Sequence, residues 1–166
     1  MHNKLLLTAF LVFGVNLSAD ETVQQAENKT GSDDFKTEML KHVNQIRSEG
    51  CKCGRRYMPP APPLQWDSKL EKAATSHAKD MNTNKFIGHK GSDNSKTSER
   101  IYAAGYDWEA VAENVSWGPS TVKAAVLGWK NSPGHCINLM SFSYKEMGAA
   151  KDGKFWVQNF GQKMSE

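Results

Sequence analysis

The sequence predicts an α+β domain, because helical patterns occupy its first part and strand patterns its last part. Apolar residues recur every three or four positions in the segments before Pro133, whereas two short runs beyond it flank the dipeptide Asp152-Gly153. The chain has 166 residues, 39% of them apolar and 23% charged, as expected for one globular domain.

The N-terminal residues predict an export signal peptide. Lys4 precedes a mostly apolar stretch over 5–17, and the small residues Ser18 and Ala19 precede Asp20. Such a stretch spans roughly 20 Å as a helix, less than the ~30 Å hydrocarbon core of a bilayer, so we favour a cleaved leader over a membrane anchor. We expect a signal peptide over 1–19, a flexible linker over 20–33 and a folded domain over 34–163 in a secreted protein, extracellular or periplasmic.

Four helices are predicted. The first runs from Asp33 or Asp34 to Gly50, and the second begins at the capping box Ser68-x-x-Glu71. A short third helix covers 98–104, and the fourth starts at Ser120 or Thr121 and ends before Pro133. Their apolar faces carry Phe35, Met39, Val43 and Ile46 in the first, Leu70, Ala73, Ala74, His77, Ala78 and Met81 in the second, and Val122, Ala125, Val126 and Trp129 in the fourth.

Irregular segments and strands complete the pattern. Four prolines within 55–63 predict an irregular crossing, and Pro133-Gly134 predicts a stiff turn outside any helix. Strands are expected over 145–151 and 154–160 around an Asp152-Gly153 hairpin turn.

Cys51, Cys53 and Cys136 lie in the part of the chain that would be exported, where disulfides persist. We therefore expect one disulfide and one remaining thiol. A zinc site at Cys51 and Cys53 is less favoured, because structural zinc needs four ligands. A nucleophilic Cys136 beside His135 is also less favoured, because catalytic partners meet in space rather than as chain neighbours.

Two histidines and two carboxylates are candidates for a site. His89 lies in a glycine-flanked loop, and the Pro133-Gly134 turn would fix the direction of His135. If residues 111–115 are extended, Glu113 shares a face with two valines and needs a cation, a metal or hydrogen-bond donors. Glu146 begins the hairpin, where solvent exposure would explain it equally well. Two histidines and one or two carboxylates are enough to bind zinc, but their spacing alone does not identify a metal site. His77, on an apolar face, is interpreted as a hydrogen-bonded core residue.

Taken together, these segments resemble the CAP superfamily, the cysteine-rich secretory, antigen 5 and pathogenesis-related-1 proteins with the SCP domain. The resemblance runs from about Phe35 to Gly161 and is closest to the short bacterial branch. It is carried by the helix face over 70–81, Phe86 to His89, Gly105-Tyr106, Ala112-Glu113-Asn114-Val115, Ser132-Pro133-Gly134-His135-Cys136-x-Asn138 and Glu146-Met147-Gly148.

The resemblance implies a three-layer α-β-α sandwich with a central antiparallel sheet and a cleft that holds a divalent metal, often zinc. His89, Glu113 and His135 match the family's cleft residues. Glu146 replaces a second family glutamate, because Ser132 stands where eukaryotic members have one. Cys53 matches the bacterial cysteine that pairs with the one at position 136, which leaves Cys51 as the additional thiol.

The favoured function is that of a secreted, non-catalytic module that binds a divalent metal, zinc above all, together with a peptide, glycan or small ligand. The alternative is a peptidase-like, metal-dependent hydrolase in which Glu146 acts as base. A lipid or sterol binder ranks third, because no added lipid-binding loop is evident. We expect a monomer without membrane contact after cleavage, and no nucleic-acid partner, because the net charge is only +3 and forms no basic stripe.

Overall fold

The computed structural model describes the backbone of residues 19–165 and the side chains of residues 33–165. Apart from Ala19, the predicted signal peptide lies outside the described residues. A compact unit spans Asp33–Glu166 and is separate from the unit that precedes it. Among the described residues, no helix has the length and apolar character needed to cross a bilayer.

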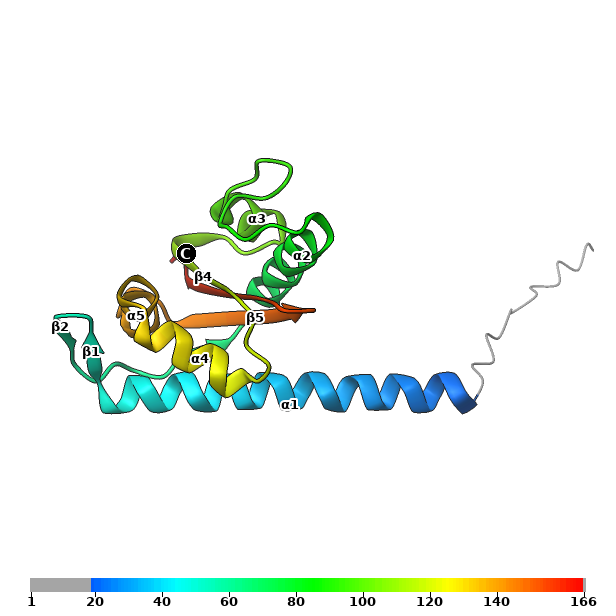
Figure 1. Ribbon diagram of the computed structural model, residues 1–166, viewed down its shortest axis with the longest axis horizontal. Coiled ribbons are helices and arrows are strands. Elements are labelled where there is room, and N and C mark those ends of the chain that lie inside the picture. Colours follow the sequence, from blue (N-terminus) through cyan, green and yellow to red (C-terminus); the bar gives the residue numbers. More distant parts are fainter. Residues whose placement is uncertain (1–18, 166) are drawn as a thin grey trace, which may run out of the picture. The chain divides into compact units, whose positions relative to one another are not determined.

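The compact unit is an α-β-α sandwich, which confirms the predicted fold class (Figure 1). Its main sheet has the strand order β3-β5-β6-β4, in which the β5–β6 and β6–β4 pairs are antiparallel and the short β3 pairs in parallel with β5. The strands of this sheet are β3 (Gln65–Trp66), β4 (Trp108–Trp117), β5 (Glu146–Asp152) and β6 (Phe155–Lys163). A separate hairpin consists of β1 (Cys51–Cys53) and β2 (Arg56–Met58).

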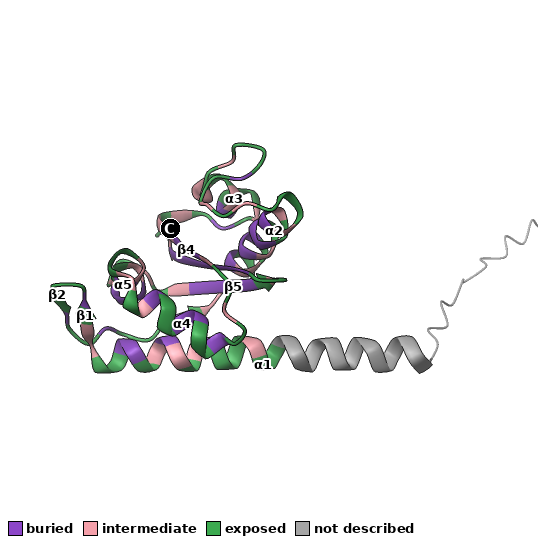
Figure 2. Cartoon of the chain, in the orientation of Figure 1, coloured by how far each residue is buried: buried purple, intermediate pink, exposed green. Residues whose placement is uncertain are grey.

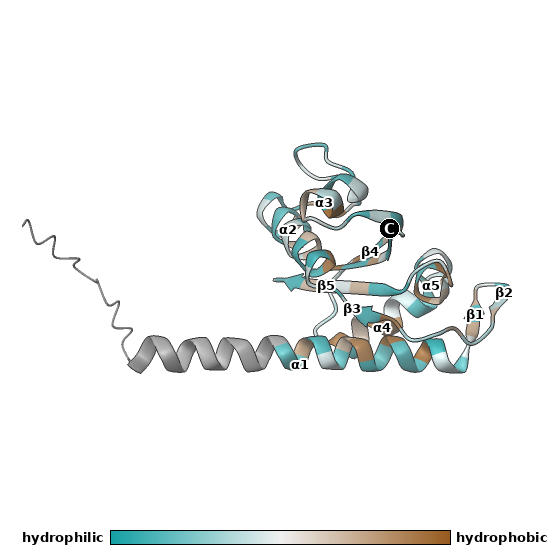
Figure 3. Ribbon diagram, turned by 180° about the vertical axis from the view of Figure 1, so that it is seen from behind, coloured by the Kyte–Doolittle hydropathy of each residue, from teal (hydrophilic) through white to brown (hydrophobic). Residues whose placement is uncertain are grey.

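Helices cover both faces of the sheet. One layer contains α2 (Ser68–Asn84) and α3 (Thr97–Ala103), and the other contains α4 (Val122–Asn131), α5 (Pro133–Met140) and the part of α1 (Ala19–Glu49) that follows Asp33. Buried residues lie on the inner sides of these elements (Figure 2). Apolar residues recur every three or four positions along the C-terminal half of α1, so that half presents an apolar stripe to the core (Figure 3).

The helix termini differ from expectation at three places. α1 is helical from Ala19 rather than from Asp33, because residues 19–30 contain no glycine or proline to stop it. Asp67, not Ser68, caps α2, since its carboxylate accepts hydrogen bonds from two backbone amides of the first turn. The predicted turn at Pro133-Gly134 is instead the start of α5, because proline is well suited to the first helical position.

Gly148 of β5 allows α2 to pack directly on the sheet. A Cβ atom at this position would lie 2.6 Å from the carbonyl carbon of Leu70 and would also collide with the backbone of Glu71. This close contact places the buried face of α2, including His77, directly over β5 and β6.

A disulfide joins Cys53 of the β1–β2 hairpin to Cys136 of α5, whereas Cys51 is a free thiol. Arg47 provides a second connection to α5. Its buried guanidinium donates hydrogen bonds to the carbonyls of Pro62, Leu139 and Ser141. Burial lowers the Arg47 pKa to about 10. These contacts fix α5 against α1 and the proline-rich crossing.

Candidate functional site

Glu113 lies on β4, an edge strand of the main sheet, opposite Asn159 of β6. Its side chain is only 2% exposed, and its strand neighbours Val111 and Val115 pack in the clusters formed with α2. The predicted extended segment is therefore correct, and so is the placement of this carboxylate on an apolar face. Because β4 is at the edge, residues from both helical layers can approach it.

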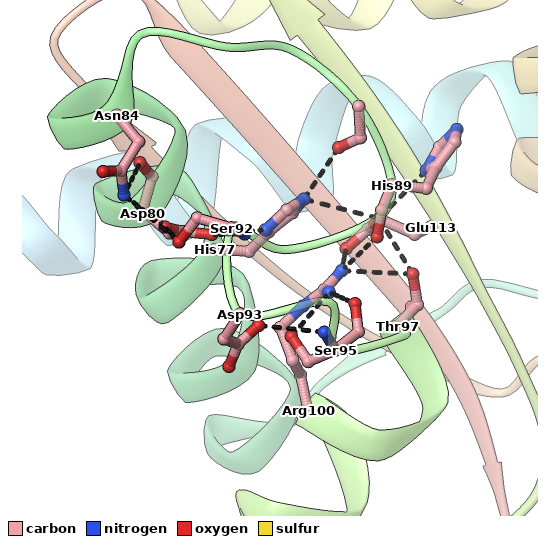
Figure 4. A network of polar contacts seen from close by, with 11 residues as sticks. His77, Asp80, Asn84, His89, Ser92, Asp93, Ser95, Thr97, Arg100 and Glu113 are labelled. Atoms are coloured by element: carbon pink, nitrogen blue, oxygen red, sulfur yellow. Dashed lines mark hydrogen bonds and ion pairs between the residues drawn. The ribbon is translucent and has the colours of Figure 1, made fainter.

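The cation that balances this carboxylate is Arg100 of α3. Its Nη2 donates to Glu113 Oε2 at 2.9 Å and to the backbone carbonyl of His89 at the same distance. The hydroxyl of Thr97, also on α3, donates to Glu113 Oε1 at 2.9 Å (Figure 4). α3 therefore neutralises the buried charge and also connects the His89 loop to β4.

His89 adds a third hydrogen bond to Glu113. The distance between His89 Nδ1 and Glu113 Oε1 is 2.9 Å, and the His89 side chain is 55% exposed. An ionised carboxylate only accepts hydrogen bonds, so Nδ1 carries the proton and donates it. Within residues 33–165, Nε2 of His89 forms no hydrogen bond with the protein.

The loop that carries His89 is held by polar contacts. His77, which is fully buried on α2, bonds through Nε2 to the carbonyl oxygen of Gly88 at 2.8 Å. Asp80, one turn further along α2, accepts hydrogen bonds from the amide and hydroxyl of Ser92. Figure 4 shows these contacts beside the Glu113 cluster. The expected core role of His77 thus includes positioning of the loop.

His135 belongs to the first turn of α5, in the other helical layer. Asn114 of β4 donates to its backbone carbonyl at 3.2 Å, and Asn138 donates both to Asn114 Oδ1 and to the carbonyl of Glu113. These amides attach α5 to the edge strand that carries Glu113. In the described part of the chain, the imidazole of His135 has no hydrogen-bond partner.

Hydrogen bonds, charges and burial shift the pKa values of Glu113, His89 and His135. The hydrogen bond to Glu113 raises the pKa of His89 in spite of partial burial. Burial and then the positive charge of His89 lower the pKa of His135. Burial alone would raise the pKa of Glu113, but the His89 hydrogen bond and the charges of Arg100 and His77 outweigh it, so that pKa is lowered.

Glu146 does not join these residues. Its carboxylate accepts a 2.7 Å hydrogen bond from the buried Tyr106 hydroxyl and forms a 2.7 Å ion pair with Lys163. Lys163 also contacts Asp67 at 3.1 Å. Burial and the hydrogen bond to Glu146 raise the pKa of Tyr106. Glu146 thus belongs to a structural ion-pair cluster.

The predicted set of His89, Glu113, His135 and Glu146 does not form one compact cluster of donor atoms in the described part of the chain. Among the described residues, the only three His, Cys, Asp or Glu side chains with donor atoms within 4.8 Å of one another are the three cysteines. Glu113 has its oxygens occupied by Arg100, Thr97 and His89. Glu113 orients the His89 ring through Nδ1, and its Nε2 and the imidazole of His135 form no hydrogen bonds within the described residues.

Sequence patterns did not identify Arg100, Thr97, Tyr106 or Lys163 as members of these clusters. The one available signal was the need of Glu113 for a cation, but the pattern could not select among the scattered basic residues. That selection depends on α3 packing beside β4.

The sandwich with histidines beside an edge-strand glutamate defines an SCP-type domain. Residues 40–160 match the model of the cysteine-rich secretory protein family, CAP, and the chain belongs to this family.

Among solved structures, an extracellular protein of Bacillus anthracis that contains an SCP domain is similar over 90% of this chain and 45% of that one, with 27% identity and a TM-score of 0.70. An outer surface protein of Borrelia burgdorferi, at 19% identity, shares the fold over 82% of this chain and 95% of that one, with a TM-score of 0.63. A Bacillus subtilis protein called uncharacterized membrane protein YlbC is 31% identical over 97 residues, which are 58% of this chain. The chain spans only 28% of that relative.

Proposed function

We propose that this chain is a secreted binding module whose cleft holds a divalent metal, zinc above all, together with an acidic small ligand or peptide. One observation carries the proposal: Glu113 orients His89 through Nδ1 and leaves Nε2 available, and Asn114, the next residue on β4, holds the backbone of His135. Neutral imidazole is a common zinc ligand, and a buried carboxylate behind it is the usual support.

His89 and His135 would hold the metal, and Glu113 would act as the outer partner of His89. A bound metal would supply open coordination positions for an oxygen of the ligand. The lowered pKa of His135 keeps its ring neutral near pH 7, which is the form that binds a metal. The raised pKa of His89 means that a metal would compete there with a proton.

The acidic character of the ligand follows from the pocket beside His89. This pocket has a volume of about 540 Å³, and its lining includes Lys90, Lys96, Thr97 and Ser98 as well as Val111, Ala112 and Glu113, whose charge Arg100 balances. The volume suits a small molecule or a short peptide segment. Two lysines near a hydrogen-bonded histidine favour a carboxylate or another anionic group.

The binding role is supported over hydrolysis by the position of Glu146. A hydrolase would need a general base near the metal, and Glu146 was the candidate. Its carboxylate pairs instead with Lys163 and Tyr106. Secretion is supported by similar structures called extracellular and outer surface proteins, and cell fractionation would test it.

Calorimetric titration of the chain with zinc tests the site. His89→Ala and His135→Ala should each abolish or strongly weaken binding, whereas the control His42→Ala should not, because His42 lies on α1 beside Glu38. If both cleft variants bind zinc as the parent does, the metal proposal is wrong. A panel of acidic and neutral ligands, titrated with and without zinc, then tests the preference for anionic groups.

A further inference from the structure

Three sulfur atoms meet where the β1–β2 hairpin contacts α5. Cys53 is joined to Cys136, with their Cα atoms 5.3 Å apart, and the Sγ atom of the free Cys51 lies 3.6 Å from Cys136 Sγ. All three sulfurs lie within 4.8 Å of one another. Cys51 and Cys53 are two residues apart on one strand, so both side chains point to the same side of the hairpin.

We propose that these cysteines form a thiol–disulfide exchange site, in which Cys51 attacks Cys136 Sγ and displaces Cys53. The Cys51 thiol loses its proton to solvent, and its sulfur forms a bond to Cys136 as the Cys53–Cys136 bond breaks. Cys53 leaves as a thiolate and takes up a proton. One disulfide and one thiol are present before and after, so the step needs no oxidant or reductant.

Burial makes Cys51 the entry point for an external thiol. Cys53 is 3% exposed and Cys136 is fully buried, whereas Cys51 is partly exposed. A small thiol cannot reach the original bridge directly. After exchange, the bridge includes the accessible Cys51 sulfur, which the small thiol can attack to form a mixed disulfide and release the Cys136 thiolate.

The surroundings make this exchange slow at neutral pH and faster in base. Burial raises the pKa of the Cys51 thiol, and the positive charge of Lys130, on α4, opposes that shift. Because the thiolate is the nucleophile, only a small fraction of the protein reacts near pH 7. Because all three sulfurs lie within 4.8 Å of one another, Cys51 Sγ lies to one side of the Cys53–Cys136 bond. Rotation of the Cys51 side chain within the folded hairpin must bring its sulfur in line with that bond before exchange.

Peptide mapping of the folded, unreduced chain tests the exchange. The chain is incubated without added thiol at pH 7 and pH 9, quenched with N-ethylmaleimide in weak acid and digested in acid, and fragmentation of the bridged peptide shows whether Cys51 or Cys53 carries the label. We expect Cys51–Cys136 peptides to form, and to form more rapidly at pH 9. Alkylation of Cys51 before incubation should prevent their formation. If folded protein yields only the Cys53–Cys136 peptide at both pH values, the proposal is refuted.

Two variants provide an independent measurement. Cys53→Ser should form a Cys51–Cys136 bridge, and Cys51→Ser should retain the original bridge. With dithiothreitol as the external thiol, the bridge in Cys51→Ser should be reduced about tenfold more slowly than in the parent, because the accessible route is lost. Equal reduction rates in folded protein, with matching circular dichroism spectra, would contradict the proposed route.

Discussion

Replacement of Glu113 by glutamine tests the charge cluster at the centre of the site. The carboxylate is 2% exposed and its partner Arg100 is 10% exposed, so the pair is shielded from solvent. Loss of one member of a buried ion pair costs about 3–5 kcal/mol of unfolding free energy. Glutamine keeps the shape and one acceptor oxygen, so we expect a loss of about 2–3 kcal/mol.

The loss of unfolding free energy in Glu113→Gln should depend on pH. The Glu113 pKa is lowered from 4.5, so its contribution is present above about pH 4.5 and disappears as the pH falls through the folded value. The His89 pKa is raised from 6.5, so its contribution is present below about pH 6.5 and disappears as the pH rises through the folded value. The difference in unfolding free energy between parent and Glu113→Gln should be greatest between these values, and the part due to the charge of His89 should disappear as the pH rises through its folded pKa.

Urea unfolding at pH 5.5 and pH 8.5 measures this difference. Glu109→Gln is a matched control on the same strand, where the side chain is exposed, and it should change stability by less than about 0.5 kcal/mol. Arg100→Met combined with Glu113→Gln should cost less than the sum of the single changes, because neither charge is then unpaired. Additive single effects, or a loss for Glu113→Gln no greater than that of the control, would refute the buried pair.

Three further predictions concern the cleft and its supports. In an NMR titration, His89→Ala should raise the pKa of His135 toward its ordinary value, because a neighbouring positive charge is removed; an unchanged value would contradict their proximity. Gly148→Ala should lower the unfolding free energy by about 3 kcal/mol, because its Cβ would collide with the α2 backbone, whereas Gly134→Ala, which meets open space, should be neutral or stabilising in the same denaturation experiment. Arg47→Met should cost about 3 kcal/mol in thermal or urea unfolding, because three carbonyl oxygens lose their charged donor; a loss below 1 kcal/mol would contradict this role.

The sequence was informative where periodicity and local chemistry determine structure. The apolar face of α2 and the extended segment around Glu113 follow from the regular spacing of side chains. The start of α5 was mispredicted, because Pro133-Gly134 is compatible both with a turn and with a first helical turn. Packing of α5 against the β1–β2 hairpin and the edge strand β4 selects the helical turn.

The composition of the site was less predictable than the fold. The need of Glu113 for a cation was visible, but the choice of Arg100 depends on where α3 packs. Glu146 was predicted as a site residue and has other partners in the structure. Its carboxylate is bound by Tyr106 and Lys163, which are distant in sequence. Long-range side-chain partners have no local sequence signature.

The segments that carry His135 and His89 differ in rigidity. α5 is anchored by a covalent bridge at Cys136, by the guanidinium of Arg47 and by the Asn114–Asn138 amides. The loop bearing His89 depends on a few partly exposed hydrogen bonds, such as that from Arg100. Segments with few buried contacts open at lower free-energy cost than packed ones. The His135 side is therefore the more rigid of the two, and we expect any local rearrangement of this region to take place in the loop that carries His89.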